Sequence, residues 1–335
     1  MTEQSKIPLP GEPIEPTARP SGTESSVERA IRGFDLARLG GFTSPLPPET
    51  PRRVVMRELT IEPSMPMPVP EVVAPAPIAA QPAIAQRPVR FGDTRHPVSR
   101  KHLRDGGLIV PEGSVTGLLE EFRIVKRQLL LQAGQLRASL GPAAQRVLIC
   151  SPLPGEGKTW CATNLALAIA AEKESEVVLV DADFAKPSVL SALGLPGGPG
   201  LMDALADPAI DVADCVLGTD IPGLWVLPAG NATTSDTEFL ASSRTRAVLD
   251  RLTEGAPHRM VIFDSPPALA ASPAAELAKY VGQALVIARA DCTGQSALED
   301  AVALLAGCPN IQLLLNAAQF SPSGRRFGSY YGYSG

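Results

Sequence analysis

The sequence predicts an α/β domain in which a mostly parallel sheet is flanked by helices on both faces. Short, near-continuous apolar runs recur along residues 112–320, and helical segments separate most of them. Such runs are typical of parallel strands, which are buried on both sides because helices cover each face of the sheet. The expected strands are residues 146–150, 177–180, 224–227, 260–263, 284–287 and 311–315.

The segments around and between these runs have helical periodicity. Residues 115–135 show it well, because their apolar side chains recur every three or four positions and so share one helix face. This stripe consists of Leu118, Phe122, Val125 and Leu129. Further helices are expected at residues 160–171, 237–253, 274–280 and 296–305.

The composition changes near residue 111. Eighteen of the 34 prolines precede it, which favours a disordered, Pro/Ala-rich arm over residues 1–111. Residues 27–39 in the arm form a short amphipathic stretch, either a docking peptide or an incidental patch. Residues 87–104 hold six Lys or Arg and one acid, Asp93. This basic stretch is consistent with a solvated linker or with contact to anionic lipid.

Bulk properties exclude several classes of protein. A net charge of −5 argues against a general nucleic-acid binder. The five cysteines are scattered and form no Cys-x-x-Cys pair, which suits reduced thiols better than disulfides or a zinc site. No apolar run is long enough to span a membrane, and the N-terminus does not look like a signal peptide. We therefore expect a cytoplasmic protein that reaches a membrane only through a partner.

Residues 151–159, Ser-Pro-Leu-Pro-Gly-Glu-Gly-Lys-Thr, connect the first strand to a helix. A strand, a glycine loop that ends in Gly-Lys-Thr and a helix together build the phosphate cradle of a P-loop NTPase. Glycines let the backbone N–H groups turn toward an anion, and the helix N-terminus adds its dipole. Lys158 can reach the β- and γ-phosphates, and the Thr159 hydroxyl can bind Mg²⁺. The expected nucleotide-binding residues are Pro154, Gly155, Glu156, Gly157, Lys158, Thr159 and Trp160.

One position departs from the usual loop. Pro152 stands where the first glycine normally lies, and proline has no N–H to donate. We expect the loop to tolerate it, because the later N–H groups make most phosphate contacts.

Acidic residues end two further strands. Asp181 and Asp183 follow residues 177–180, and Asp264 follows residues 260–263. A buried aspartate is costly unless it is paired or holds a metal ion. At the carboxyl edge of the sheet, beside a triphosphate, a hydrated Mg²⁺ would supply the missing charge.

Four motifs in this order resemble the bacterial tyrosine kinases of polysaccharide export, and among them most closely the exosortase-associated tyrosine autokinases. The motifs are the phosphate loop, Val-Leu-Val-Asp-Ala-Asp at 178–183, Leu-Pro-Ala-Gly at 227–230 and Ile-Phe-Asp-Ser-Pro-Pro at 262–267. The resemblance covers residues 115–335 and not the arm.

The resemblance implies a role for each motif. It assigns catalysis to Lys158, Asp181, Asp183 and Asp264, with Asp181 or Asp183 accepting the tyrosine proton. It implies Mg²⁺ binding by Thr159 and Asp264 together with Asp181, and adenine contact by Asn316. The expected cofactors are ATP and Mg²⁺, and the expected partners are other copies of the chain and an inner-membrane chain-length determinant, or polysaccharide co-polymerase.

The chain departs from the family at three places. Ala185 and Lys186 stand where arginines often follow the second motif, and Pro273 replaces an aspartate after the third. The ring-assembly signature Glu-x-x-Arg-x-x-Arg ends in Lys126 instead of arginine. Lysine lacks the planar fork of arginine, so assembly is expected to be weaker or differently regulated.

The C-terminal tail, residues 321–335, is rich in glycine and serine and holds three of the four tyrosines. These are Tyr330, Tyr331 and Tyr333. A flexible tail can enter the active site of a neighbouring subunit, and the resemblance implies phosphorylation in trans. The alternative interpretation is a sticky aromatic end or a docking tag without phosphorylation.

Two other functions remain open. Partitioning ATPases of the same fold carry a second lysine where this chain has Leu153, and a tyrosine tail serves them no purpose. A non-catalytic nucleotide-binding scaffold is favoured slightly by Pro152, Ala185 and Lys126. The leading hypothesis is a non-specific protein-tyrosine kinase that regulates exopolysaccharide polymerisation or export.

Overall fold

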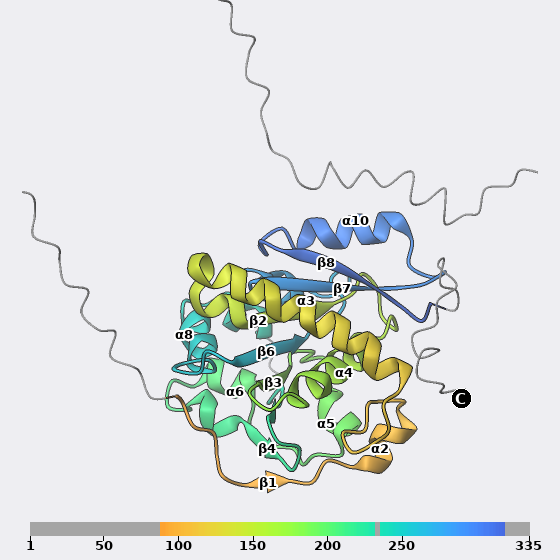
Figure 1. Cartoon of the computed structure of the whole chain (residues 1–335). Helices are drawn as coiled ribbons and strands as arrows, with labels where there is room; N and C mark the ends of the chain where they lie inside the picture. Colours follow the sequence, from red (N-terminus) through yellow and green to blue (C-terminus); the bar gives the residue numbers. More distant parts are fainter. Residues whose placement is uncertain (1–87, 232–234, 319–335) are drawn as a thin grey trace, which may run out of the picture. The chain divides into compact units, whose positions relative to one another are not determined.

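The computed structural model describes residues 88–231 and 235–318 (Figure 1). The expectations for residues 1–87, including the amphipathic stretch 27–39, lie outside the described residues. So do those for the tail and its three tyrosines.

The described strands form one eight-stranded sheet in the order β1-β4-β5-β3-β6-β2-β7-β8. All neighbouring pairs are parallel except β4 and β5. The strands are β1 Arg95–His96, β2 Arg146–Cys150, β3 Glu176–Asp181, β4 Leu217–Thr219, β5 Leu224–Leu227, β6 Arg259–Asp264, β7 Gln283–Arg289 and β8 Ile311–Asn316.

The mostly parallel sheet predicted from the sequence is confirmed, with all six expected strands in it. The sequence did not indicate β1 and β4, because strands of two and three residues are too short to show a periodicity. Together they extend the sheet at its β5 edge, where β4 runs antiparallel to β5.

Helices cover both faces of the sheet. The described α-helices are α2 Arg100–Asp105, α3 Gly117–Leu140, α4 Lys158–Ala170, α5 Val189–Leu193, α6 Leu201–Ala206, α7 Asp236–Leu240, α8 Arg244–Arg251, α9 Pro273–Ala278 and α10 Gln295–Leu304. The single helix expected at 237–253 is two helices, because a turn closed by the Ser242 N–H on the Phe239 carbonyl separates α7 from α8.

Alternate residues of the central strands belong to two hydrophobic cores, one on each face of the sheet. Leu148 and Phe263 face the core shared with α6, α8 and α9. Ile149 and Leu179 face the core shared with α3 and α4, which cross in front of the strands in Figure 1. Helix α4 is buried along almost its whole length because α3 lies over it. The helix that begins at the phosphate loop is thus enclosed between sheet and α3.

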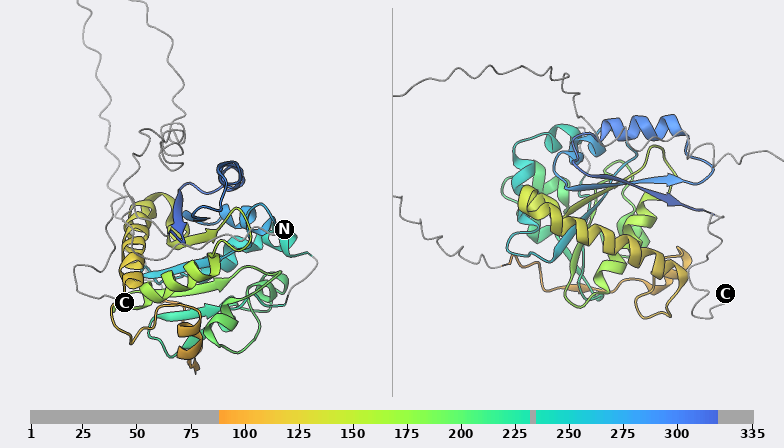
Figure 2. Two further views of the ribbon diagram at one scale, coloured as in Figure 1. Left: turned by 90° about the vertical axis from the view of Figure 1, so that its right-hand side faces the viewer. Right: turned by 45° about the horizontal axis from the view of Figure 1, so that its top comes forward.

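The expected domain boundary at residue 111 is wrong for residues 88–111, which belong to the folded unit. This segment follows the β4 edge of the sheet and then turns toward α4 (Figure 2). Its apolar side chains explain why it folds, since six of them join the two cores. They are Val89, Phe91, Val98, Leu103, Leu108 and Ile109. The prolines and basic residues around them conceal this pattern in the sequence.

Candidate functional site

The phosphate loop lies at the carboxyl end of β2, between β6 and β7 in the sheet. Gly155 and Gly157 have φ of +80° and +95°, a region that side chains other than glycine rarely adopt. Gly157 is the N-cap of α4, so Lys158 and Thr159 form the first turn of the helix. A Cβ on Gly157 would also lie 2.2 Å from the Asn316 amide nitrogen. The left-handed turn therefore requires glycine at 157, and the Asn316 side chain would have to move aside for any Cβ there.

Glu156 holds the loop in shape with its buried carboxylate. One oxygen accepts the N–H of Leu153 at 2.8 Å, and the other accepts the Thr293 hydroxyl, from the segment between β7 and α10. The Thr293 oxygen in turn accepts the N–H of Arg289 at 2.7 Å. The loop is thus tied to the neighbouring strand β7.

Pro152 fits this arrangement. Its carbonyl accepts the N–H of Leu269 at 3.3 Å, and the Ser151 carbonyl accepts the N–H of Ala268 at 2.8 Å. The next N–H along the chain, that of Leu153, is used by Glu156. The start of the loop is therefore packed against the segment after β6, and the N–H groups left to face an anion are those of the later loop.

Thr159 and Asp264 form the central polar pair of the site. The Thr159 hydroxyl donates to Asp264 Oδ2 at 2.6 Å. Asp264 is fully buried, and its second oxygen, Oδ1, has no hydrogen-bond partner within the described part of the chain. Burial raises the pKa of Asp264 to about 7, against the opposing effects of the Thr159 hydrogen bond and the Lys158 charge. An unpartnered, buried carboxylate oxygen needs a cation or a proton.

Asp181 lies beside Asp264, because the two residues are register partners on β3 and β6. Its Oδ2 accepts the N–H groups of Ser188 and Val189 at 2.8 and 2.9 Å, at the start of α5. Its Oδ1 accepts the N–H of Asp183 at 3.3 Å. Burial raises the pKa of Asp181 to about 6, although these backbone hydrogen bonds oppose the shift. The carboxylate orders the chain between β3 and α5.

Asp183 is more accessible than Asp181. Its side chain is half-buried, and Oδ1 accepts the N–H of Lys186 at 3.1 Å, which forms a tight turn after β3. Of the two acids in the second motif, Asp183 is therefore the one whose carboxylate a ligand can reach more easily.

These oxygens fit a magnesium ion. Mg²⁺ prefers carboxylate, hydroxyl and phosphate oxygens, and it usually keeps several waters. The unpartnered Asp264 Oδ1 and the adjacent Thr159 hydroxyl supply such ligands. Across residues 88–231 and 235–318, no cluster of three or more His, Cys, Asp or Glu side chains could hold a metal. Magnesium at this site would thus depend on phosphate and water for its remaining ligands.

Comparison with known proteins identifies the family. No family model matches the chain. It is 30% identical to tyrosine-protein kinase YwqD of Bacillus subtilis over 218 residues, which are 64% of this chain and 86% of that protein. The chain belongs to the bacterial tyrosine-protein kinases.

A second relative agrees with this assignment, and a solved structure shows the same fold. The chain is 32% identical to tyrosine-protein kinase ptk of Acinetobacter johnsonii over 153 residues, 46% of this chain. It spans only 20% of the length of that larger relative. The kinase domain of the Escherichia coli tyrosine kinase ETK has the same fold, with a TM-score of 0.53 and 21% identity over 68% of this chain and 96% of that domain.

Two residues of this bacterial tyrosine kinase that were expected to contact the nucleotide, Trp160 and Asn316, form hydrogen bonds within the protein. The Trp160 indole N–H donates to the carbonyls of Gly106 and Gly107, at 3.1 and 3.2 Å, outside the loop. The Asn316 amide donates to the carbonyl of Glu156 at 2.9 Å, so Asn316 does reach the loop.

Sequence reasoning missed two residues that hold the loop, Thr293 and Arg289. Arg289 ends β7, and its guanidinium reaches the Gly155 carbonyl at 3.4 Å. Neither residue belongs to a motif. The available signal was their place at the carboxyl end of β7, the strand that borders the phosphate-loop strand, and in the segment just after it.

The departures from the family pattern occupy different settings. Ala185 and Lys186 are exposed on the turn after Asp183, and Pro273 begins α9. Lys126, on α3, is buried against α4, where its ammonium pairs with Glu172 at 2.7 Å and donates to the Ala168 carbonyl at 3.3 Å. The last position of the assembly signature is thus engaged at the carboxyl end of α4 in its own chain.

Within the described ranges, no helix is both long and apolar enough to cross a membrane.

Proposed function

We propose that this chain is an ATP-dependent protein-tyrosine autokinase that phosphorylates its C-terminal tyrosines in trans. The acceptors would be Tyr330, Tyr331 and Tyr333. The proposal is carried by the Thr159–Asp264 pair, a hydroxyl and a buried carboxylate 2.6 Å apart at the first turn of α4. In a member of the bacterial tyrosine kinases, this pair has the chemistry of an ATP and magnesium site.

The loop and helix would bind the triphosphate of ATP. Backbone N–H groups from Gly155 to Thr159 lie where the α4 dipole favours an anion, and Lys158 adds a full charge. Thr159 and Asp264 would hold Mg²⁺, which neutralises charge on the phosphates when bound. Asp181 would act mainly by ordering the segment that carries Asp183, since backbone N–H groups occupy both of its oxygens.

Asp183 would accept the proton of the incoming tyrosine. The tyrosine oxygen forms a bond to the γ-phosphorus as the bond between that phosphorus and the ADP oxygen breaks, and the phenol proton passes to the Asp183 carboxylate. Most of the rate of such a transfer comes from position and charge neutralisation. A partly exposed carboxylate beside a buried site suits this role.

We further propose that the kinase acts on exopolysaccharide polymerisation or export, as the resemblance to the exosortase-associated autokinases implies. It would work as a cytoplasmic homo-oligomer that meets the inner membrane through a chain-length-determinant protein. No nucleic-acid partner is proposed, since the net charge is −5.

The test is incubation of the full chain with Mg-ATP, followed by mass mapping of phosphate. Phosphate is expected on Tyr330, Tyr331 or Tyr333 and lost in Lys158→Met. Lys173→Met is the matched control, because Lys173 is an exposed lysine beyond the end of α4, outside the loop and the second motif. Tyr280, the remaining tyrosine, is half-buried between α9 and β7 and serves as an internal control for non-specific modification.

The alternative functions give different results in the same assay. Nucleotide binding without phosphate on tyrosine, with the cytoplasmic segment of a chain-length determinant present, supports the scaffold. ATP hydrolysis without transfer to tyrosine supports a partitioning-type ATPase. Either outcome refutes the kinase proposal.

A further inference from the structure

Residues 88–112, here called the strap, connect the β4 edge of the sheet to the helix that follows the phosphate loop. The strap begins where the Val89 N–H donates to the Glu254 carbonyl at 2.9 Å, and it forms β1 beside β4. It then passes through α2 and reaches α4. None of the four motifs that carry the family resemblance includes it.

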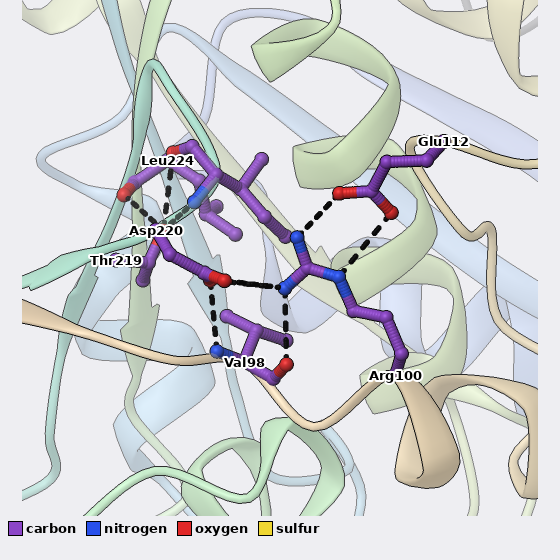
Figure 3. Close-up of polar contacts among 7 residues, drawn as sticks. Val98, Arg100, Glu112, Thr219, Asp220 and Leu224 are labelled. Atoms are coloured by element: carbon purple, nitrogen blue, oxygen red, sulfur yellow. Dashed lines mark hydrogen bonds and ion pairs between the residues drawn. The ribbon is translucent and has the colours of Figure 1, made fainter.

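The strap is anchored at its middle by Arg100 (Figure 3). The guanidinium donates to Asp220, just after β4, at 2.9 Å and also pairs with Glu112 at the other end of the strap. Asp220 also accepts the N–H of Val98 at 2.9 Å. One arginine thereby ties the two halves of the strap to each other and to the sheet.

A second set of contacts joins the strap to the first turns of α4. The Trp160 indole N–H donates to the carbonyls of Gly106 and Gly107, and the ring packs edge-on against Phe122 with centroids 5.7 Å apart. One turn further along α4, Asn164 Oδ1 accepts the N–H of Ile109 at 2.8 Å. Residues four apart share one helix face, so the strap is hydrogen-bonded to a single side of α4.

A tight turn in the strap brings the carbonyls of Gly106 and Gly107 to Trp160. Gly107 has φ of +63°, a left-handed conformation that turns the chain after α2. Below the turn, a cavity of about 480 Å³ separates the strap from α4 and α5. Its lining includes Thr159 and Thr163. The buried hydroxyl of Thr163 has no hydrogen-bond partner among the described residues. The strap therefore holds the start of α4 through hydrogen bonds at defined points.

The held helix carries the chemistry of the site. Lys158, Thr159 and Trp160 are consecutive, and α4 has no side-chain N-cap to fix its first turn. The Thr159 hydroxyl lies 2.6 Å from Asp264 Oδ2. Displacements of about 1 Å weaken such contacts, so whatever fixes Trp160 also fixes Thr159.

We propose that Trp160 is a positioning residue and that the strap, through it, sets the affinity of the phosphate loop for Mg-ATP. The proposal rests on the nucleotide site of the proposed function but not on transfer to tyrosine. Release of the strap at either anchor, Arg100 or Trp160, should loosen the first turn of α4 and weaken nucleotide binding.

The test measures Mg-ATP affinity of the full chain by titration calorimetry. Trp160→Phe keeps a ring against Phe122 and removes the N–H donor, and we expect affinity to fall about fivefold to tenfold. Trp225→Phe is the control for ring size, since its ring also packs against the strap, at Phe91, and no hydrogen bond of its indole occurs in the described structure. In steady state, KM for ATP should rise more than kcat falls.

The coupling between the two anchors is the sharper test. Arg100→Gln should weaken ATP binding, and its effect should largely disappear in the Trp160→Phe background, because both changes break the same connection. Arg244→Gln is the matched control, an arginine that joins α8 to α6 outside the strap by donating to the carbonyls of Ala204 and Asp207.

Hydrogen exchange of the first turn of α4 gives a readout without nucleotide. Faster exchange there in Trp160→Phe and Arg100→Gln, but in neither control, supports the proposal. Variants that match the wild type in both affinity and exchange overturn it, as do additive effects of the two anchors. A chain that binds ATP in this strap-dependent way but modifies no tyrosine refutes the kinase function alone.

Discussion

Replacing Asp264 with asparagine should stabilise the protein while removing a ligand of the proposed magnesium site. The Asp264 carboxyl is fully buried, and its pKa is raised from 3.8 to about 7. Because the folded-state pKa lies above the unfolded one, the folded state loses stability as pH rises from about 4 to about 7. At pH 8 the ionised carboxylate costs the fold about 4 kcal/mol, since each tenfold change in proton affinity is worth about 1.4 kcal/mol.

Asparagine removes that charge but keeps the acceptor for Thr159. Its amide NH₂ replaces Oδ1, which has no partner among the residues described, and an unpaired buried donor costs about 1 to 3 kcal/mol. The net expectation is a gain of about 1 to 3 kcal/mol at pH 8 and little change near pH 5. For a domain of this size, that corresponds to a rise in Tm on the order of 5 °C.

The assay is thermal unfolding from pH 5 to pH 8 with a chelator and without nucleotide. Asp220→Asn is the matched control with the opposite sign. Burial alone would raise the pKa of Asp220, but the Val98 N–H and Arg100 lower it, so its loss should destabilise the fold at pH 8. Mg-ATP should raise the Tm of the wild type and not of Asp264→Asn. An Asp264→Asn protein that is less stable than the wild type at pH 8, without metal, would refute the reasoning.

Three further predictions concern the loop, the helix and the tail. Glu156→Gln and Thr293→Val should each lower the affinity for Mg-ATP, measured by calorimetry, several-fold and change the Tm little, because they loosen the phosphate loop and not the core. An unchanged affinity in both variants would contradict the role of these two residues in holding the loop. Lys126→Ala should lower the free energy of unfolding, measured with urea, by about 1 to 2 kcal/mol, since Glu172 and the carboxyl end of α4 lose their cation. Lys173→Ala, at an exposed lysine close to Glu172 in sequence, is the control and should leave the free energy of unfolding unchanged. Phosphorylation of the tail at residues 321–335 should loosen the proposed homo-oligomer through charge repulsion, and equal association by light scattering before and after complete phosphorylation would contradict this prediction.

Much of the site could be predicted because its chemistry is local in sequence. Gly157, Lys158 and Thr159 are consecutive, and the strand–loop–helix order that surrounds them is visible in the hydrophobic pattern. Asp264 could be placed at the same edge because parallel strands end together, and the structure puts its carboxylate on the Thr159 hydroxyl.

Other parts could not be predicted because they depend on packing between distant segments. Glu156 is fixed by Thr293, and Trp160 by the carbonyls of Gly106 and Gly107, contacts with no sequence periodicity. The difference between Asp181 and Asp183 arises from backbone N–H groups on the chain that follows. Identical residues in one motif thus acquire different surroundings from their hydrogen bonds.

By itself, the sequence determined the alternation of strands and helices, the phosphate loop and the acids at the strand ends. These features follow from hydrophobic periodicity and from short motifs, which act over a few neighbouring residues. Only the tertiary structure decided that residues 88–111 belong to the fold and that the strap grips α4 beside the loop. The physical reason is that burial and hydrogen bonding join residues far apart in the chain, as when Arg100 meets Asp220.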